Sequence, residues 1–247
     1  MAERPTAAVL IIGNEILSGR THDANLPYIA EKLSAMGIVL EEARVVPDRE
    51  EAIVEAVNAC RAAHTYVLTT GGIGPTHDDI TARSVAAAFN LPVERHPQAV
   101  ERLQRQYAAG GLNAARLKMA DLPKGAALID NPVSGAPGFQ IENVYVLAGV
   151  PDIMKAMFDG LNLTGGPPIV TRAISCFVTE GGIAGGLAEI QRRFPAADIG
   201  SYPFFRSGSF GTTLVVRGTD RDAVEAAAAA IRELIESYGA EPIEQGP

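Results

Sequence analysis

The fold of this chain is decided by residues 66–81, which read Tyr66-Val67-Leu68-Thr69-Thr70-Gly71-Gly72-Ile73-Gly74-Pro75-Thr76-His77-Asp78-Asp79-Ile80-Thr81. The first five are aromatic, apolar or β-branched and predict a buried strand. The strand runs directly into glycines, and the spacing of apolar residues from Ile80 to Phe89 predicts a helix after them. This order is typical of an α/β sheet that binds its ligand at the carboxyl ends of its strands.

The same alternation of strand and helix extends to both sides of this stretch. Further strands are predicted at Ala7–Ile12, Ile38–Val46, Ala126–Ile129 and Val144–Ala148. Helices are predicted from Asn25 to a stop at Gly37, around Ile53–Cys60, and over Pro97–Tyr107 and Ile153–Leu161. We therefore expect a three-layer α/β domain over residues 5–163, with a mainly parallel sheet covered on both faces.

The order of elements changes after a Gly-Pro stretch at Thr164–Pro168, which is typical of a linker. A strand is predicted at Arg172–Thr179, a helix at Ile183–Phe194, a hairpin of Ile199–Phe205 and Thr212–Arg217 around Arg206-Ser207-Gly208-Ser209, and a helix at Asp220–Tyr238. This β-α-β-β-α pattern predicts a small α+β domain over residues 169–240. The tail from Ala240 to Pro247 is expected to be frayed.

Composition excludes several classes of protein. The chain has 247 residues, of which 47% are hydrophobic and 20% charged, a balance typical of globular proteins. Its net charge of −8 gives it no general attraction for nucleic acid. No apolar run is long enough to span a membrane, and the acidic start of the chain does not fit a signal peptide, so a cytoplasmic protein without nucleic-acid or membrane partners is expected.

The glycine-rich loop is the strongest candidate site. Gly71, Gly72 and Gly74 would let a ligand approach the main chain, and free N–H groups there would attract a phosphate. Asp78 and Asp79 follow at once, and carboxylates beside a phosphate imply a cation such as Mg²⁺ between them. The alternative is structural: Asp78 as the N-cap of the next helix, with Asp79 in its first turn.

A second candidate is the loop after the first strand, Gly13 to Asn25. Here Glu15 and Asp23 are candidate ligands for a metal or for ribose hydroxyls, and Ser18 and Arg20 are candidate phosphate contacts. The alternative is that Asp23 or Asn25 merely caps the following helix. A loop with many polar groups at the carboxyl end of a strand is nevertheless a favourable place for a site.

Later loops and the remaining reactive residues carry weaker signals. Asn131–Phe139 and Ala148–Met154 contain Gly138 and Gly149, which allow close backbone approach but also fit ordinary turns. His22 and His77 lie in candidate loops, where histidine can donate to phosphate or transfer protons. His64 and His96 are expected at the surface, and Cys60 and Cys176 in the core. Gly182–Gly185 fits a GXXG loop, but we favour a structural helix start.

The loops together resemble the molybdopterin-binding (MoCF) domain superfamily, and within it the N-terminal part of CinA (competence/damage-inducible protein A). The resemblance covers about residues 5–161. It rests on four ordered loops: Gly13–Gly19, Gly71–Thr81, Gly135–Phe139 and Gly149–Pro151. Ala148 and Asp152 depart from the family pattern. The tail is similar to the small KH-like middle domain of CinA, and with 247 residues the chain is expected to lack the C-terminal deamidase domain of full-length CinA.

The resemblance implies two related chemistries. CinA-type domains are associated with metal-dependent hydrolysis of ADP-ribose, and a related domain of FAD synthase with FAD cleavage. Other members bind molybdopterin and adenylylate it with Mg-ATP. We expect the first, with Mg²⁺ or Co²⁺ and K⁺ as candidate ions. Molybdopterin binding or adenylyl transfer is the alternative, and a non-enzymatic ligand-binding or scaffold protein is the third hypothesis.

The residues expected to carry this function follow from the matching loops. A metal would be held by Asp78, Asp79 and Glu15, and catalysis would use Asp78, Asp79 and His77. The ligand and its phosphates would be bound by Gly71, Gly72, Gly74, Thr76, Gly13, Asn14, Ser18, Asp23, Asn25, Gly138 and Gly149. The expected partners are a small nucleotide or pterin and further copies of the chain in a homo-oligomer.

Overall fold

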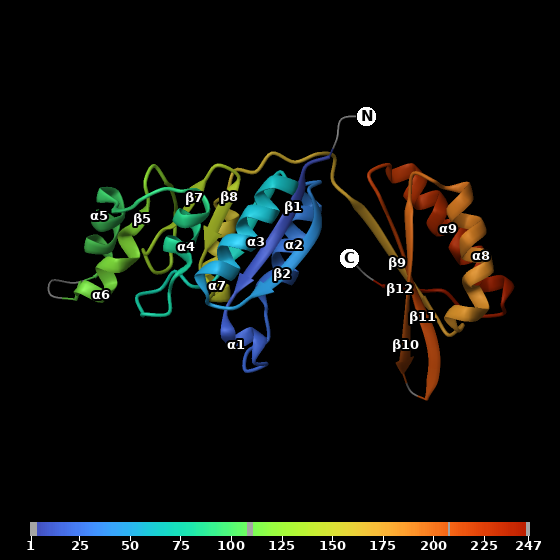
Figure 1. The fold of residues 1–247 in the computed structure, drawn as a ribbon. Coiled ribbons are helices and arrows are strands. Elements are labelled where there is room, and N and C mark those ends of the chain that lie inside the picture. The colour runs from blue at the N-terminus through green and yellow to red at the C-terminus, as the bar shows by residue number, and fades with distance from the viewer. Residues whose placement is uncertain (1–3, 108–110, 207, 246–247) are drawn as a thin grey trace. The chain divides into compact units, whose positions relative to one another are not determined.

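The structure, a computed structural model, describes residues 4–107, 111–206 and 208–245. The chain forms two compact units, Met1–Gly166 and Pro167–Pro247 (Figure 1). The division falls within the Gly-Pro stretch at residues 164–168.

The first unit is an α/β domain. Its strands are β1 (Thr6–Ile12), β2 (Val39–Val46), β3 (Tyr66–Thr70), β4 (Val93–Arg95), β5 (Asp121–Pro123), β6 (Ala127–Ile129), β7 (Gly138–Ile141) and β8 (Val144–Leu147). Its helices are α1 (Asn14–Leu17), α2 (Asn25–Ala35), α3 (Glu50–Ala63), α4 (Thr81–Ala88), α5 (Pro97–Gln106), α6 (Ala114–Leu117), the 3₁₀ turn η1 (Lys118–Ala120) and α7 (Pro151–Asp159).

The main sheet has the order β2-β1-β3-β8-β7-β6. Strands β2, β1, β3 and β8 run parallel, whereas β7 and β6 are antiparallel additions at one edge. The prediction of a mainly parallel sheet is therefore confirmed. β4 and β5 form a separate antiparallel pair.

The sheet is covered on both faces, which explains why β1 is apolar along its whole length. Leu10 and Val67 face a core built with α3 and α4, whereas Val9 and Leu68 face one built with α2 and α7. Because successive residues of a strand point to opposite faces, both sets must be apolar. Cys60 lies in the first of these cores, where burial raises the pKa of its thiol.

Because β1, β3 and β8 run parallel, their carboxyl ends lie on the same side of the sheet. The amide of Gly13, after β1, donates to the carbonyl of Val46 at 3.1 Å. The amide of Gly71, after β3, donates to the carbonyl of Leu147 at 3.2 Å. The loops singled out in the sequence therefore converge.

The second unit is a sheet with two helices. It contains β9 (Val170–Cys176), α8 (Glu180–Arg193), β10 (Asp198–Arg206), β11 (Ser209–Gly218), α9 (Arg221–Ser237) and β12 (Ile243–Gln245). The strands pair in the antiparallel order β10-β11-β9-β12, and α8 and α9 lie together on one face (Figure 1). The glycines of Gly182–Gly185 lie inside α8, as the structural alternative predicts.

Two predictions are wrong. The tail is not frayed at Ile243–Gln245, which pair with the open edge of β9, and Glu244 forms an ion pair with Arg232 at 2.6 Å. His64 is not a surface residue: 7% of its side chain is exposed, and its ring nitrogens lie 3.4 and 3.3 Å from Glu41 and Glu42. Ser207, in the predicted hairpin turn, and the last two residues of the tail, Gly246 and Pro247, lie outside the described residues.

Cys60 and Cys176 are both buried and unpaired, as predicted. Among the described residues, the helices are all too short or too polar to cross a lipid bilayer.

Candidate functional site

The turn after β3 requires glycine at two successive positions. Gly71 has φ +102°, and a Cβ there would lie 2.2 Å from the carbonyl oxygen of Ile12. Gly72 has φ +66°, and its Cβ would lie 2.2 Å from Oγ1 of Thr81. That hydroxyl donates to the carbonyl of Gly71 at 2.9 Å, so the first residue of α4 holds the turn. Gly71 and Gly72 therefore place backbone atoms, with no side chain over them, at the carboxyl end of β3 in the middle of the sheet.

The two aspartates after this turn do not cap α4. The helix begins at Thr81 with Ile80 as its N-cap residue, and no side chain caps it. Instead, both carboxylates converge on the hydroxyl of Thr76, which lies 2.5 Å from Oδ1 of Asp78 and 2.5 Å from Oδ2 of Asp79. The capping alternative is therefore wrong for this pair.

The surroundings of the aspartates keep negative charge beside the loop. The bond from the Thr76 hydroxyl holds the pKa of the Asp78 carboxyl below its ordinary value. The amide of Thr76 also donates to Oδ2 of Asp79 at 2.7 Å. His77 is almost fully exposed, and its Nδ1 lies 3.9 Å from Oδ1 of Asp78. Asp78 thus stays ionised at a lower pH than an ordinary aspartate.

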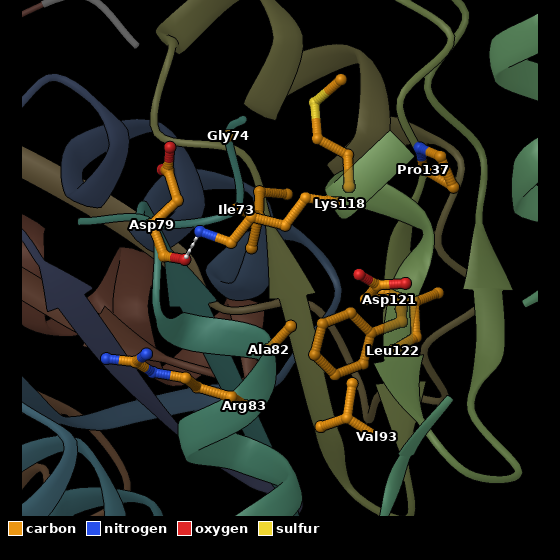
Figure 2. Close-up of a pocket in the computed structure, with 13 residues that line it drawn as sticks. Ile73, Gly74, Asp79, Ala82, Arg83, Val93, Lys118, Asp121, Leu122 and Pro137 are labelled. Atoms are coloured by element: carbon orange, nitrogen blue, oxygen red, sulfur yellow. Dashed lines mark hydrogen bonds between the residues drawn. The ribbon is translucent and has the colours of Figure 1, made fainter. Parts of the chain in front are cut away.

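Lys118 closes this loop from another part of the chain. Its Nζ donates to the carbonyl of Thr76 and, at 3.0 Å, to the carbonyl of Asp79 (Figure 2). Sequence reasoning missed this residue because Lys118 lies on the short 3₁₀ turn η1, about which the periodicity says nothing. The positively charged ammonium group of Lys118 is thereby held beside the glycine loop and the two carboxylates.

A pocket of about 210 Å³ lies beside α4, and we call it the α4-side pocket (Figure 2). It is lined by Gly72, Ile73, Gly74, Asp79, Ala82, Arg83, Val93, Lys118, Met119, Asp121, Leu122, Pro137 and Phe139. Most of these side chains are apolar, and the polar ones include the cations Lys118 and Arg83. Asp121 is already engaged, because it accepts two hydrogen bonds from Arg95 at 2.6 and 2.9 Å. The pocket suits a flat apolar ring with an anionic group attached.

A second, smaller pocket of about 70 Å³ lies where α2 and α7 begin, and we call it the strand-end pocket. It is lined by Ile11, Ile12, Glu15, Ile16, Thr21, His22, Asp23, Ala24, Asn25, Thr70, Gly71, Gly149 and Pro151. Gly71 thus borders this pocket and Gly72 borders the other. The two pockets flank the glycine turn.

Asp23 and Asn25 have different roles at the start of α2. The N-cap residue of α2 is Ala24, but Oδ2 of Asp23, one residue earlier, accepts from the amide of Leu26 at 2.8 Å and so stabilises the helix start. Asn25 does not cap; its Nδ2 donates to the carbonyl of Gly149 at 2.8 Å. Asn25 therefore ties the first loop to the loop after β8.

Several of the predicted site residues lie in the two pockets, some in each. Glu15, Asp23, Asn25, Gly71 and Gly149 line the strand-end pocket, and Gly72, Gly74 and Asp79 line the α4-side pocket.

The other predicted ligand residues have local structural roles. Gly13 and Asn14 hold the first loop, since the amide of Asn14 donates to Asp48 at 2.8 Å. The hydroxyl of Ser18 donates to the carbonyl of Glu15, and Ser18 lines neither pocket. Gly138 is buried in β7, where a Cβ would lie 2.3 Å from the carbonyl of Val146.

The three predicted metal ligands do not form one cluster. Glu15 lies in the strand-end pocket, whereas Asp79 lines the α4-side pocket. Within the part of the chain that the structure describes, no group of three or more His, Cys, Asp or Glu side chains is placed to hold a metal ion. A cation at Asp78 and Asp79 would therefore need oxygen ligands from a bound substrate or from water.

Two family models match the chain. Residues 8–165 match the family described as "Probable molybdopterin binding domain", and residues 168–243 match "FAD synthase, middle domain". The second match identifies a relationship for the small unit that the sequence motifs did not reveal.

Individual relatives agree with both matches. A "Probable FAD synthase" of Caenorhabditis elegans is 32% identical over 96% of this chain and 51% of its own length. A "CinA-like protein" of Parasynechococcus marenigrum is 35% identical over 61% of this chain and 38% of its own length. The chain thus spans about half of the first relative and less than half of the second.

One solved structure resembles the first unit closely. It is the protein CinA of Thermoplasma acidophilum, described as having unknown function. It has 32% sequence identity and a TM-score of 0.60, and the match covers 63% of this chain and 95% of that one.

Proposed function

The chain belongs to the family described as "Probable molybdopterin binding domain", its first unit is of CinA type, and we propose that it is a metal-dependent hydrolase of adenine dinucleotides. Its substrate would be ADP-ribose or a similar compound such as FAD. The observation that carries the proposal is the convergence of Asp78 and Asp79 on one hydroxyl, directly after a glycine turn at the sheet edge.

The donor set fits a hard divalent cation. The carboxylates of Asp78 and Asp79 lie against the same hydroxyl, and on this proposal one ion would bind both. Mg²⁺ is commonly held by one or two carboxylates together with substrate phosphate oxygens and water. Asp78 and Asp79 would hold the ion, which would neutralise phosphate charge and polarise the phosphoryl group.

The chain itself would hold the diphosphate. Among the described residues, the amides of Gly72, Ile73 and Gly74 donate no hydrogen bond, so they are available to phosphate oxygens. Lys118 adds a fixed positive charge beside them, and the α4-side pocket offers an apolar wall for a ring.

The reaction proposed is the attack of water on one phosphorus atom. A new P–O bond forms as the bond to the bridging oxygen breaks, which turns ADP-ribose into AMP and ribose 5-phosphate. On this proposal the exposed imidazole of His77, whose Nδ1 lies 3.9 Å from Oδ1 of Asp78, would take up the proton released by the water. Placing and neutralising the phosphates supplies most of the acceleration in phosphoryl transfer.

The comparisons support the class of ligand. The C. elegans relative carries the name of an enzyme of FAD metabolism, and the small unit matches a domain named after that enzyme. FAD and ADP-ribose share an adenosine joined to a second group by a diphosphate. Because the chain spans only half of that relative, we take from it the class of ligand and not its whole activity.

The test is product formation by the full chain. Incubation with ADP-ribose and Mg²⁺ or Co²⁺, with and without K⁺, is expected to release AMP and ribose 5-phosphate, resolved by ion-exchange chromatography. FAD in place of ADP-ribose would release AMP and FMN. Excess EDTA is expected to stop the reaction. The absence of AMP with both substrates and every ion would overturn the proposal.

A pterin is the second candidate ligand. The family description names molybdopterin, and the apolar α4-side pocket suits a flat ring system. On this alternative the purified protein retains a fluorescent pterin, or transfers the adenylyl group of Mg-ATP to one. Release of AMP from ADP-ribose without pterin binding would favour the first proposal.

A further inference from the structure

Two residues that line the strand-end pocket each carry a buried polar side-chain atom without a hydrogen-bond partner. The two atoms are Oδ1 of Asn25 and Oγ1 of Thr70, in side chains of residues that are only 4% and 1% exposed. Leaving such an atom unpaired in a folded protein is costly, so a buried polar group is normally satisfied by protein, water or ligand. Because both residues line one pocket, a ligand bound there is the candidate partner for both atoms.

The chemistry of that partner follows from the orientation of the Asn25 amide. Its nitrogen donates to the carbonyl of Gly149, which can only accept, so the other amide atom must be the oxygen. That oxygen can only accept a hydrogen bond. The carboxylates of Glu15 and Asp23 line the same pocket and are also acceptors when ionised. The pocket therefore favours a group that donates hydrogen bonds and disfavours a phosphate.

The size of the pocket limits the ligand further. A volume of about 70 Å³ has no room for a fused ring system. It has room for about two hydroxyl-sized groups, since a water molecule occupies roughly 30 Å³ in the liquid, so only the hydroxyl-bearing edge of a sugar would enter it. Hydroxyls also suit Thr70, whose Oγ1 can donate or accept.

We propose that the strand-end pocket is a pentose subsite, in which Oδ1 of Asn25 and Oγ1 of Thr70 bind the hydroxyl groups of a ribose. The inference rests on the proposed function for the nature of the ligand, whose diphosphate would cross the glycine turn between the two pockets. Each of the two atoms exposes less than 1 Å², so the inference requires the pocket lining to open for the sugar.

Two adjacent threonines provide a matched pair of variants. Thr69 and Thr70 are both buried in β3, and both hydroxyls are unpartnered. Successive strand residues point to opposite faces of the sheet, and Thr69 does not line the strand-end pocket. Thr70→Val and Thr69→Val each delete one unpaired hydroxyl at nearly constant shape. Neither is expected to lower stability, because no bond within the fold is lost.

The experiment measures binding by isothermal titration with Mg²⁺ present, because the proposed site needs the ion beside the diphosphate. The probes are the methylene-bridged, non-hydrolysable analogues of ADP-ribose, ADP and 2′,3′-dideoxy-ADP, named below by their parent compounds. Thr70→Val is expected to raise the Kd of ADP-ribose about tenfold, the effect of one net hydrogen bond. Thr69→Val is expected to leave it within twofold of wild type.

The probes identify which ribose occupies the pocket. If Thr70→Val weakens ADP-ribose alone, the terminal ribose is bound there. If it weakens ADP-ribose and ADP but not the dideoxy probe, the ribose of adenosine is bound there. Equal effects of Thr70→Val and Thr69→Val, an equal loss for all three probes, or no binding of ADP-ribose by wild type would overturn the inference.

Failure of the proposed function would look different. If Thr70→Val weakens binding as expected but the wild-type protein releases no AMP, the ribose subsite is supported and the hydrolase function is overturned. Release of AMP at equal rates by Thr70→Val and Thr69→Val, with equal affinities, would remove the subsite alone.

Discussion

Replacing Asp79 with asparagine is expected to lower kcat for ADP-ribose hydrolysis by about 100-fold or more, in line with the loss of a group that stabilises a charged transition state. Asparagine keeps an oxygen that can accept from the amide and hydroxyl of Thr76, so the loop geometry should survive. The negative charge that would hold the cation is lost. Steady-state rates at saturating Mg²⁺, together with thermal unfolding, measure both effects.

Asp159 supplies the matched control. Its carboxylate accepts from the hydroxyl of Tyr28 at 2.8 Å and pairs with Lys32 at 2.9 Å, and it lines neither pocket. Asp159→Asn therefore makes the same chemical change in the same unit and should leave kcat unchanged. If Asp79→Asn kept more than half of the wild-type rate, the assigned role of the carboxylate would be wrong. A wild-type protein without turnover would favour a non-enzymatic scaffold.

Gly71→Ala is expected to destabilise the first unit by roughly 3 kcal/mol or more, the range of severe backbone and packing defects. The added Cβ would lie 2.2 Å from the carbonyl oxygen of Ile12, which belongs to the central strand β1. Backbone there cannot move without disturbing the pairing of β1 with β3. Urea unfolding of the full chain, monitored by circular dichroism, measures the loss.

Gly125→Ala is the control that measures the cost of a positive φ alone, without a steric clash like that between a Cβ at Gly71 and the carbonyl oxygen of Ile12. Gly125 has φ +80°, but a Cβ there would meet nothing within 4 Å. Its substitution should cost only about 1–2 kcal/mol, the penalty of a left-handed conformation for an L-residue. If both variants lost the same stability, the close approach of Gly71 to Ile12 would not be the reason for glycine at this position.

Much of the fold is predictable because its signals are local. Strand β3 is observed over the predicted residues 66–70, and β1 differs from its prediction by one residue at its start. In both cases an apolar run long enough for a buried strand is ended by glycine. The convergence of the loops after β1, β3 and β8 follows from parallel pairing alone.

The rest depends on contacts between distant parts of the chain. Lys118 contacts Asp79 from 39 residues away, and Asn25 contacts Gly149 from 124 residues away, so no local pattern indicates either contact. Aspartate is a favoured N-cap residue, so Asp78 suggests a helix start. The helix α4 begins later because Thr81 is hydrogen-bonded to the carbonyls of Gly71 and Gly72. The pairing of the tail with β9 likewise depends on an edge left open in the folded unit.

A crystal structure of the full chain with Mg²⁺ and a non-hydrolysable ADP-ribose analogue tests the central claim most directly. Phosphate oxygens are expected within hydrogen-bonding distance of the amides of Gly72–Gly74, with a cation shared between those oxygens and the carboxylates of Asp78 and Asp79. A diphosphate bound away from the glycine turn, or a cation bound without either aspartate, would contradict the proposed function.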